Sequence, residues 1–145
     1  MGRRRKFGLA VVALLIAAGA VWYFAIREPA PGDDLRRLRG DWKLAPGGRE
    51  GRVPVIVRVT GDRWAYVVGG QEGKAYRQAL RPHAEPREID LTQLGPDGQP
   101  TPFVLRGIYR FQEGGVLVLV APGGQPRPAA FDAPDGPPVW VLERP

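Results

Sequence analysis

Hydrophobic and polar positions alternate along residues 53–60, where every second residue is Val. A period of two places one row of side chains on each face of an extended chain, so this segment is predicted to be a strand with one buried face. Gly61 and Asp62 follow as a two-residue turn signal, and residues 64–68 resume the alternation with aromatic and apolar side chains. The pattern therefore predicts a β-hairpin.

Short apolar segments separated by Pro and Gly continue to the end of the chain, a spacing typical of β-sandwiches and barrels. Further strands are predicted at residues 40–45, 74–80, 87–91, 103–111, 116–120, 127–132 and 139–144. Gly107 marks a point where a strand bends or another backbone approaches closely. One helical turn is expected before Gly40, with Asp33 and Asp34 as N-cap or first-turn carboxylates. We predict an all-β fold, a small antiparallel barrel of eight or nine strands whose closure removes exposed edges.

The N-terminal segment has a different character. Residues 7–26 contain neither a charged residue nor Pro, and residues 3–6 are all basic. At about 1.5 Å per residue, a helix of this length spans the roughly 30 Å hydrocarbon core of a bilayer. The basic cluster should stay in the cytoplasm, which sends the remaining chain outward. A cleaved signal peptide is the alternative, because residues 18–20 read Ala-Gly-Ala, although the apolar run exceeds the usual length of a signal-peptide core.

The predicted organisation has three parts. Residues 1–27 form a membrane anchor or signal segment, residues 28–34 a Pro-containing linker, and residues 35–145 the barrel domain. Much of the net charge of +6 belongs to the first part, because basic and acidic residues nearly balance after it. Interspersed signs of this kind are typical of an ordinary solvated surface, so no nucleic-acid partner is expected.

Composition excludes several chemistries. The chain has no Cys, Ser or Asn and a single His. Disulfides, Cys or Ser nucleophiles and thiolate metal sites are therefore excluded. His83 lies in a Pro-flanked loop with Glu85, which gives too few ligands for a closed zinc site. Asp90 is expected to face solvent or to bond a neighbouring turn. We expect no metal site and no catalytic residue.

The two ends of the predicted barrel domain carry a further signal. Gly40 and Trp42 follow the expected helical turn, and Arg144 ends the last predicted strand. This arrangement resembles the calycins or lipocalins, in which a Trp on the first strand plugs the closed end of the barrel and a basic side chain from the last strand lies across its indole. A planar guanidinium can stack on the ring while its N–H groups stay bonded. The alternative is an ordinary core Trp42 and a solvated Arg144.

The order of several short motifs extends the resemblance over residues 35–144. The motifs are Leu38-Arg39-Gly40-Asp41-Trp42-Lys43, Ile89-Asp90-Leu91-Thr92, Gly107-Ile108-Tyr109, Arg127-Pro128 with Phe131, and Val141-Leu142-Glu143-Arg144. In this order they resemble an uncharacterised lipocalin-like (calycin-type) domain family that is abundant in planctomycete bacteria. The resemblance implies a small β-barrel, often behind a secretion or anchoring segment, and no established activity. The apolar residues 53–55 depart from the family pattern at a strand start.

Aromatic residues expected on the inward face are the candidate ligand-binding residues: Trp64, Tyr66, Tyr109 and Trp140. Such side chains can line an apolar cavity, and Tyr and Trp add polar groups that orient a ligand. The alternative is a filled core, because an eight-stranded barrel is just wide enough for its own side chains.

Two functional hypotheses follow for a domain outside the cytoplasm, held at the inner membrane of a bacterial cell envelope or secreted if the leader is cleaved. In the first, the barrel binds a small apolar or amphipathic ligand. In the second, it is an envelope protein-interaction or structural module with a filled barrel, whose loops, such as residues 121–128, contact a partner. Neither requires catalysis, so we expect no enzyme and no cofactor.

Overall fold

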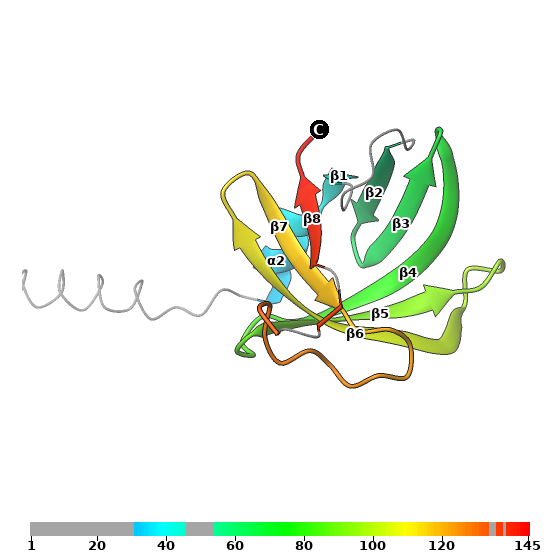
Figure 1. Ribbon diagram of the computed structural model, residues 1–145. Coiled ribbons are helices and arrows are strands. Elements are labelled where there is room, and N and C mark those ends of the chain that lie inside the picture. Colours follow the sequence, from blue (N-terminus) through cyan, green and yellow to red (C-terminus); the bar gives the residue numbers. More distant parts are fainter. Residues whose placement is uncertain (1–30, 46–53, 134–135, 138) are drawn as a thin grey trace, which may run out of the picture.

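The computed structural model describes residues 31–45, 54–133, 136–137 and 139–145. In these residues, eight antiparallel strands form a closed barrel, and one short helix precedes the first strand (Figure 1). The elements are α2 (Pro31–Leu38), β1 (Gly40–Leu44), β2 (Val55–Thr60), β3 (Arg63–Val68), β4 (Gln71–Arg81), β5 (Arg87–Leu94), β6 (Pro100–Gln112), β7 (Gly115–Val120) and β8 (Val139–Glu143). The prediction of an all-β antiparallel barrel of eight or nine strands is confirmed.

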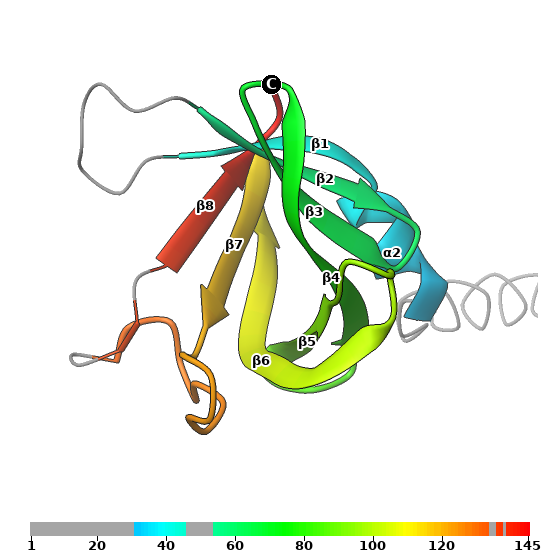
Figure 2. The same ribbon diagram turned by 90° about the vertical axis from the view of Figure 1, so that its right-hand side faces the viewer.

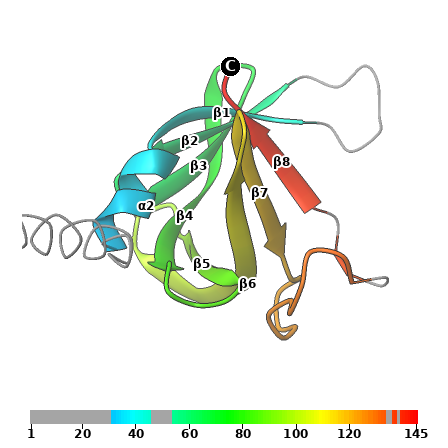
Figure 3. The same cartoon turned by 90° about the vertical axis from the view of Figure 1, so that its left-hand side faces the viewer.

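Each strand pairs with its neighbours in sequence, and the last strand returns to the first. Lys43 and Leu44 of β1 pair with Glu143 and Leu142 of β8, which closes the sheet. The predicted hairpin is also present, because β2 and β3 pair in register across the turn that contains Gly61. The helix α2 lies against one end of the barrel, where β1 begins (Figure 3). We call this the α2 end.

The barrel interior is occupied by its own side chains. Alternate residues of the strands point inward, as the period of two predicts. The fully buried members of the core cluster are Leu38, Val57, Val59, Trp64, Ile89, Leu91, Tyr109, Val116, Val118 and Leu142. The interior is therefore packed as an ordinary hydrophobic core, which is the alternative that the small size of the barrel suggested.

The described residues between β7 and β8 add no strand to the sheet. Residues 127–132 were predicted as a strand, and this prediction is wrong, because the segment consists of turns, bends and irregular backbone on the outside of the barrel (Figure 2). Hydrogen bonds from one side chain hold this segment against the sheet. Arg127 donates from Nη1 to the carbonyl oxygens of Ile89 at 3.2 Å and Gly107 at 2.7 Å. We call residues 121–133 the strap.

The strap contacts the outer face of β5 and β6 through Arg127 and Phe131. Ile108 of β6 and Leu119 of β7 pair with each other and are fully buried, although their neighbours in sequence are the ones that point inward. Gly107 has the close backbone neighbour that was predicted for it, because a Cβ there would lie 2.6 Å from the carbonyl oxygen of Leu119. The fold thus buries apolar side chains on both faces of the sheet at this point.

The N-terminal predictions fall mostly outside the described residues. The predicted transmembrane segment, residues 7–26, lies there entirely. Where the structure does describe the chain, it contains no helix with the length and apolar character needed to cross a bilayer. The helix α2 begins at Pro31, inside the range 28–34 that was expected to be a linker.

Candidate functional site

The α2 end of the barrel is sealed by Trp42 and Arg144. The indole Nε1 of Trp42 donates to the carbonyl oxygen of Leu38 at 2.6 Å, and the guanidinium carbon of Arg144 lies 3.8 Å from the centre of the Trp42 ring. Arg144 also donates to the carbonyl oxygens of Arg39 at 3.2 Å and Arg37 at 3.1 Å. The last carbonyls of a helix lack partners within the helix. The expected stack therefore also caps α2.

Gly40 makes room for this stack. Its φ is +119°, a conformation that residues with a side chain rarely adopt, and a Cβ at this position would lie 2.7 Å from Nη1 of Arg144. The Gly-x-Trp pattern thus has a physical meaning in this chain. The Gly admits the guanidinium, and the Trp offers the ring on which the guanidinium stacks.

A buried carboxylate lies beside the seal. Asp34 of α2 is fully buried, and the hydroxyl of Tyr109 donates to its Oδ2 at 2.6 Å. Arg87 forms an ion pair with the same oxygen at 3.2 Å, and Arg37 approaches Oδ1 to 3.9 Å. Burial, followed by the hydrogen bond to the carboxylate, raises the pKa of Tyr109 above its usual value. These contacts dock α2 on β5 and β6 and hold two guanidinium groups near one carboxylate.

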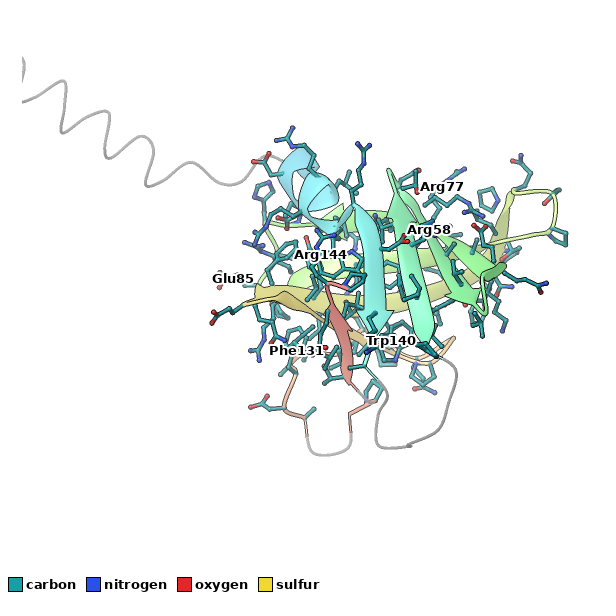
Figure 4. The ribbon with its side chains drawn as sticks, turned by 90° about the horizontal axis from the view of Figure 1, so that it is seen from above. Arg58, Arg77, Glu85, Phe131, Trp140 and Arg144 are labelled. Atoms are coloured by element: carbon teal, nitrogen blue, oxygen red, sulfur yellow. The ribbon has the colours of Figure 1, made fainter. Side chains whose placement is uncertain are left out.

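A cavity of about 840 Å³ opens on the outer surface at the α2 end. This open cavity is bordered by α2, the turn between β4 and β5, the end of β6 and the strap. Figure 4 places Glu85 of the turn and Phe131 of the strap on the side of the barrel that carries α2. Its charged and aromatic lining residues are Arg37, Glu85, Arg87, Arg110, Tyr109, Phe111 and Phe131.

Three guanidinium groups of this cavity stack on its aromatic rings. The guanidinium carbon of Arg37 lies 3.6 Å from the centre of the Phe111 ring, and that of Arg87 lies 5.8 Å from it. Arg110 lies 4.9 Å from the ring centre of Phe131. Stacking orients a guanidinium but leaves its N–H edge free to form hydrogen bonds. The arrangement is therefore suited to bind an anion.

The opposite end of the barrel carries an aromatic cluster. The rings of Tyr66 and Tyr76 meet edge to face at 6.0 Å, and those of Tyr66 and Trp140 at 6.2 Å. Burial raises the pKa of Tyr66 above its usual value. Phe103, Val68 and Val139 lie at this end, and Phe103 remains 43% exposed. The rim of this end is thus more apolar than the cavity at the α2 end.

The four predicted ligand-binding residues all belong to the barrel core or pack against it. Tyr66 interacts with Trp64 and meets the ring of Trp140 edge to face. Tyr109 faces α2, and its hydroxyl is bonded to Asp34. Tyr66 thus links Trp64 and Trp140, whereas Tyr109 also contacts the α2 end.

The sequence analysis did not single out the guanidinium groups of the cavity. Arg110 alternates with apolar residues on β6 and points outward from the barrel, so it is indistinguishable in sequence from a solvated surface residue. Arg37 and Arg87 are 50 positions apart. The sequence analysis did name three other lining residues: Tyr109 as a ligand-binding candidate, His83 as a loop residue, and Phe131 in the Arg-Pro-x-x-Phe motif, whose ring is the one on which Arg110 stacks.

Two other polar residues from the sequence analysis have clear positions. His83 is exposed in the turn between β4 and β5 and lines the cavity. Within the described parts of the chain, no cluster of three or more His, Cys, Asp or Glu residues could hold a metal. Asp90 accepts from Arg127 at 2.7 Å and from Arg81 at 2.9 Å. It therefore bonds a neighbouring segment, one of the two roles expected for it.

Comparison with known proteins gives no match, whether with family models, curated proteins or solved structures. The class that the structure defines is an all-β, eight-stranded antiparallel closed barrel with one short helix in the described residues. A small barrel of this kind is compatible with a ligand-binding domain and with a structural one.

Proposed function

We propose that the chain is a lipocalin-like domain of the bacterial cell envelope, anchored in the inner membrane by residues 7–26 and lying outside the cytoplasm. The lipocalin-like assignment is supported by the stack of Arg144 on Trp42 at the α2 end. The anchor is supported by the basic and apolar pattern of residues 1–27. If the leader is cleaved, the same domain is secreted.

The domain acts as a binding module and not as an enzyme, and it binds on the outside of the barrel. One contrast carries this proposal: side chains fill the barrel interior, whereas a cavity of about 840 Å³ lies outside it. Small-molecule sites usually have volumes of about 300 to 1,000 Å³ and an apolar lining with a few polar groups. The aromatic rings and guanidinium groups of this cavity can contact a ligand and fix its orientation, as the residues of a binding site do.

Native mass spectrometry of the full chain, purified in a nonionic detergent, tests where ligands bind. A filled barrel predicts that Tyr66→Trp, which enlarges a side chain at the end opposite α2, leaves the pattern of bound molecules unchanged. An apolar adduct that is lost in Tyr66→Trp and kept in Arg110→Gln would indicate carriage inside the barrel and contradict the proposal.

Protease treatment of spheroplasts tests the location. Added protease should degrade the domain while the inner membrane is intact, and the undigested protein should stay in the membrane fraction after a high-salt wash. Protection of the domain would contradict the extracytoplasmic location, and recovery of the whole population in the soluble fraction would contradict the anchor.

A second candidate function is ligand binding at the end opposite α2. The observation that favours it is the edge-to-face cluster of Tyr66, Tyr76 and Trp140 below a rim that exposes Phe103. Aromatic clusters that are partly exposed to solvent can bind apolar ligands that enter the open end of a barrel. The Tyr66→Trp experiment separates this function from binding at the α2 end.

A further inference from the structure

We propose that the cavity at the α2 end binds a phosphate group attached to an apolar or aromatic body. This inference rests on the proposed function, because it names the ligand chemistry of the same outer binding surface. It is carried by three guanidinium groups that line one cavity, by the rings that orient them and by the charges around them.

The buried carboxylate of Asp34 positions two of the three cations. It pairs with Arg87 at 3.2 Å and lies 3.9 Å from Arg37. Both guanidinium groups also lie over the ring of Phe111. Arg37 is oriented mainly by its close stack on the ring, and Arg87 mainly by its hydrogen bonds to Asp34. Each guanidinium keeps N–H groups that can bind a ligand, and its partial orientation lowers the entropy lost on binding.

Arg110 supplies the third cation, and its guanidinium stacks on the ring of Phe131. Among the described residues, no carboxylate forms an ion pair with it. Cavity-lining carboxylates can oppose an incoming anion, and the one exposed carboxylate of the lining belongs to Glu85. With Asp34 included, three cations face two carboxylates, so the cavity keeps an excess of positive charge. A phosphate monoester carries about −1.5 to −2 charges at neutral pH and three acceptor oxygens, which suits several guanidinium groups at once.

The walls of the cavity indicate that the ligand has an apolar part. Phe111 and Phe131 contribute ring surface, and Pro82 and Pro86 contribute the aliphatic surface of the turn between β4 and β5. A free phosphate ion would leave most of a volume of about 840 Å³ unfilled. The lining therefore fits a ligand with a charged head and an apolar or aromatic body.

Two sources could supply this chemistry: a soluble phosphate ester and the headgroup of an anionic phospholipid. The position of α2 in the sequence, close to the predicted membrane segment, is relevant to the phospholipid headgroup. Only residues 27–30 separate the predicted membrane segment from α2, and four residues span at most about 14 Å. In an anchored protein this tether would keep the α2 end close to the lipid surface.

Isothermal titration of the full chain in nonionic detergent micelles, at low ionic strength, tests the proposal. The probes are phenyl phosphate, benzoate as a carboxylate of similar size, and dihexanoyl phosphatidylglycerol. The test variant is Arg110→Gln, which removes the guanidinium that stacks on Phe131. The matched control is Arg106→Gln, because Arg106 is also an exposed Arg of β6 but does not line the cavity.

Phenyl phosphate should bind the parent chain more tightly than benzoate does. Arg110→Gln should weaken its binding by about tenfold, the value of one charge-assisted hydrogen bond, whereas Arg106→Gln should change it by less than about twofold. Tighter binding of phosphatidylglycerol at the same site identifies a lipid headgroup as the source, and tighter binding of phenyl phosphate identifies a soluble ester.

The proposal is overturned if both variants weaken binding equally, if benzoate binds as tightly as phenyl phosphate, or if no phosphate probe binds at millimolar concentration. Failure of the phosphate proposal can be distinguished from failure of the proposed function. A native mass spectrum that Tyr66→Trp leaves unchanged would still place binding outside the barrel, with a ligand of other chemistry.

Discussion

Replacing Gly40 by Ala tests the physical account of the seal. The new Cβ would lie 2.7 Å from Nη1 of Arg144, and the residue would keep a φ of +119°. The guanidinium is the far end of a flexible side chain, so it should swing away from the Trp42 ring rather than force the backbone to move. The expected damage is therefore backbone strain plus the loss of the contacts of Arg144.

The expected loss in the free energy of unfolding is the sum of the backbone strain and the lost contacts of Arg144. A strained backbone conformation costs about 1 to 3 kcal/mol. An exposed cation–π stack contributes about 0.5 to 1 kcal/mol. Each of the two hydrogen bonds from Arg144 to helix carbonyls contributes about 1 kcal/mol. We expect Arg144→Ala to lower the free energy of unfolding by about 2 to 3 kcal/mol and Gly40→Ala to lower it by about 3 to 6 kcal/mol.

A double-mutant cycle isolates the part due to Arg144. In the Arg144→Ala background, Gly40→Ala should cost only the backbone strain, so the coupling energy should be about 2 to 3 kcal/mol. Gly61→Ala is the matched control, because Gly61 has a φ of +61° and a Cβ there would meet no atom within 4 Å. Its cost should be about 1 to 2 kcal/mol, with no coupling to Arg144.

Urea unfolding of the full chain in nonionic detergent, followed by Trp fluorescence, measures these free energies. The reasoning is refuted if Gly40→Ala costs no more than Gly61→Ala. It is also refuted if the coupling energy between positions 40 and 144 is below about 0.5 kcal/mol, within the usual error of additivity.

Three further predictions concern the core and its buried polar groups. Trp42→Ala should lower the free energy of unfolding by about 3 to 5 kcal/mol in the same urea assay, because the ring is buried; a loss below about 1 kcal/mol would exclude the plug role. Tyr109→Phe should cost about 1 to 3 kcal/mol, because the buried Asp34 loses its 2.6 Å hydrogen bond; an unchanged urea midpoint would contradict this contact. Stability should fall as the pH rises above 10.0, where Tyr66 ionises in the unfolded chain but stays protonated when folded; the fall should be less steep in Tyr66→Phe, and an identical slope would contradict burial of this phenol.

The strands were predictable where the pattern is local. The Val repeat of β2 and the aromatic alternation of β3 specify which side chains point inward, and a single turn fixes their register. The seal was predictable for another reason. Arg144 lies more than 100 positions after Gly40 and Trp42, but closure of the barrel brings the first and last strands together. The stack itself was expected from the resemblance to the lipocalins, and barrel closure makes it geometrically feasible.

The strap and the cavity depend on contacts that no local pattern encodes. Residues 127–132 were predicted as a strand, but Arg127 finds its carbonyl partners on β5 and β6. Asp34 resembles an ordinary first-turn carboxylate, yet its main partner, Tyr109, is 75 positions away. Only the assembled barrel places such groups together.

The most direct test of the central claim, that ligands bind outside the filled barrel at the α2 end, is a backbone amide NMR titration of the full chain with phenyl phosphate. The account predicts saturable shift changes around Arg87, Arg110 and Phe131, which line the cavity. Changes centred on Tyr66 and Trp140, with the cavity residues unaffected, would place the ligand at the other end of the barrel and contradict it.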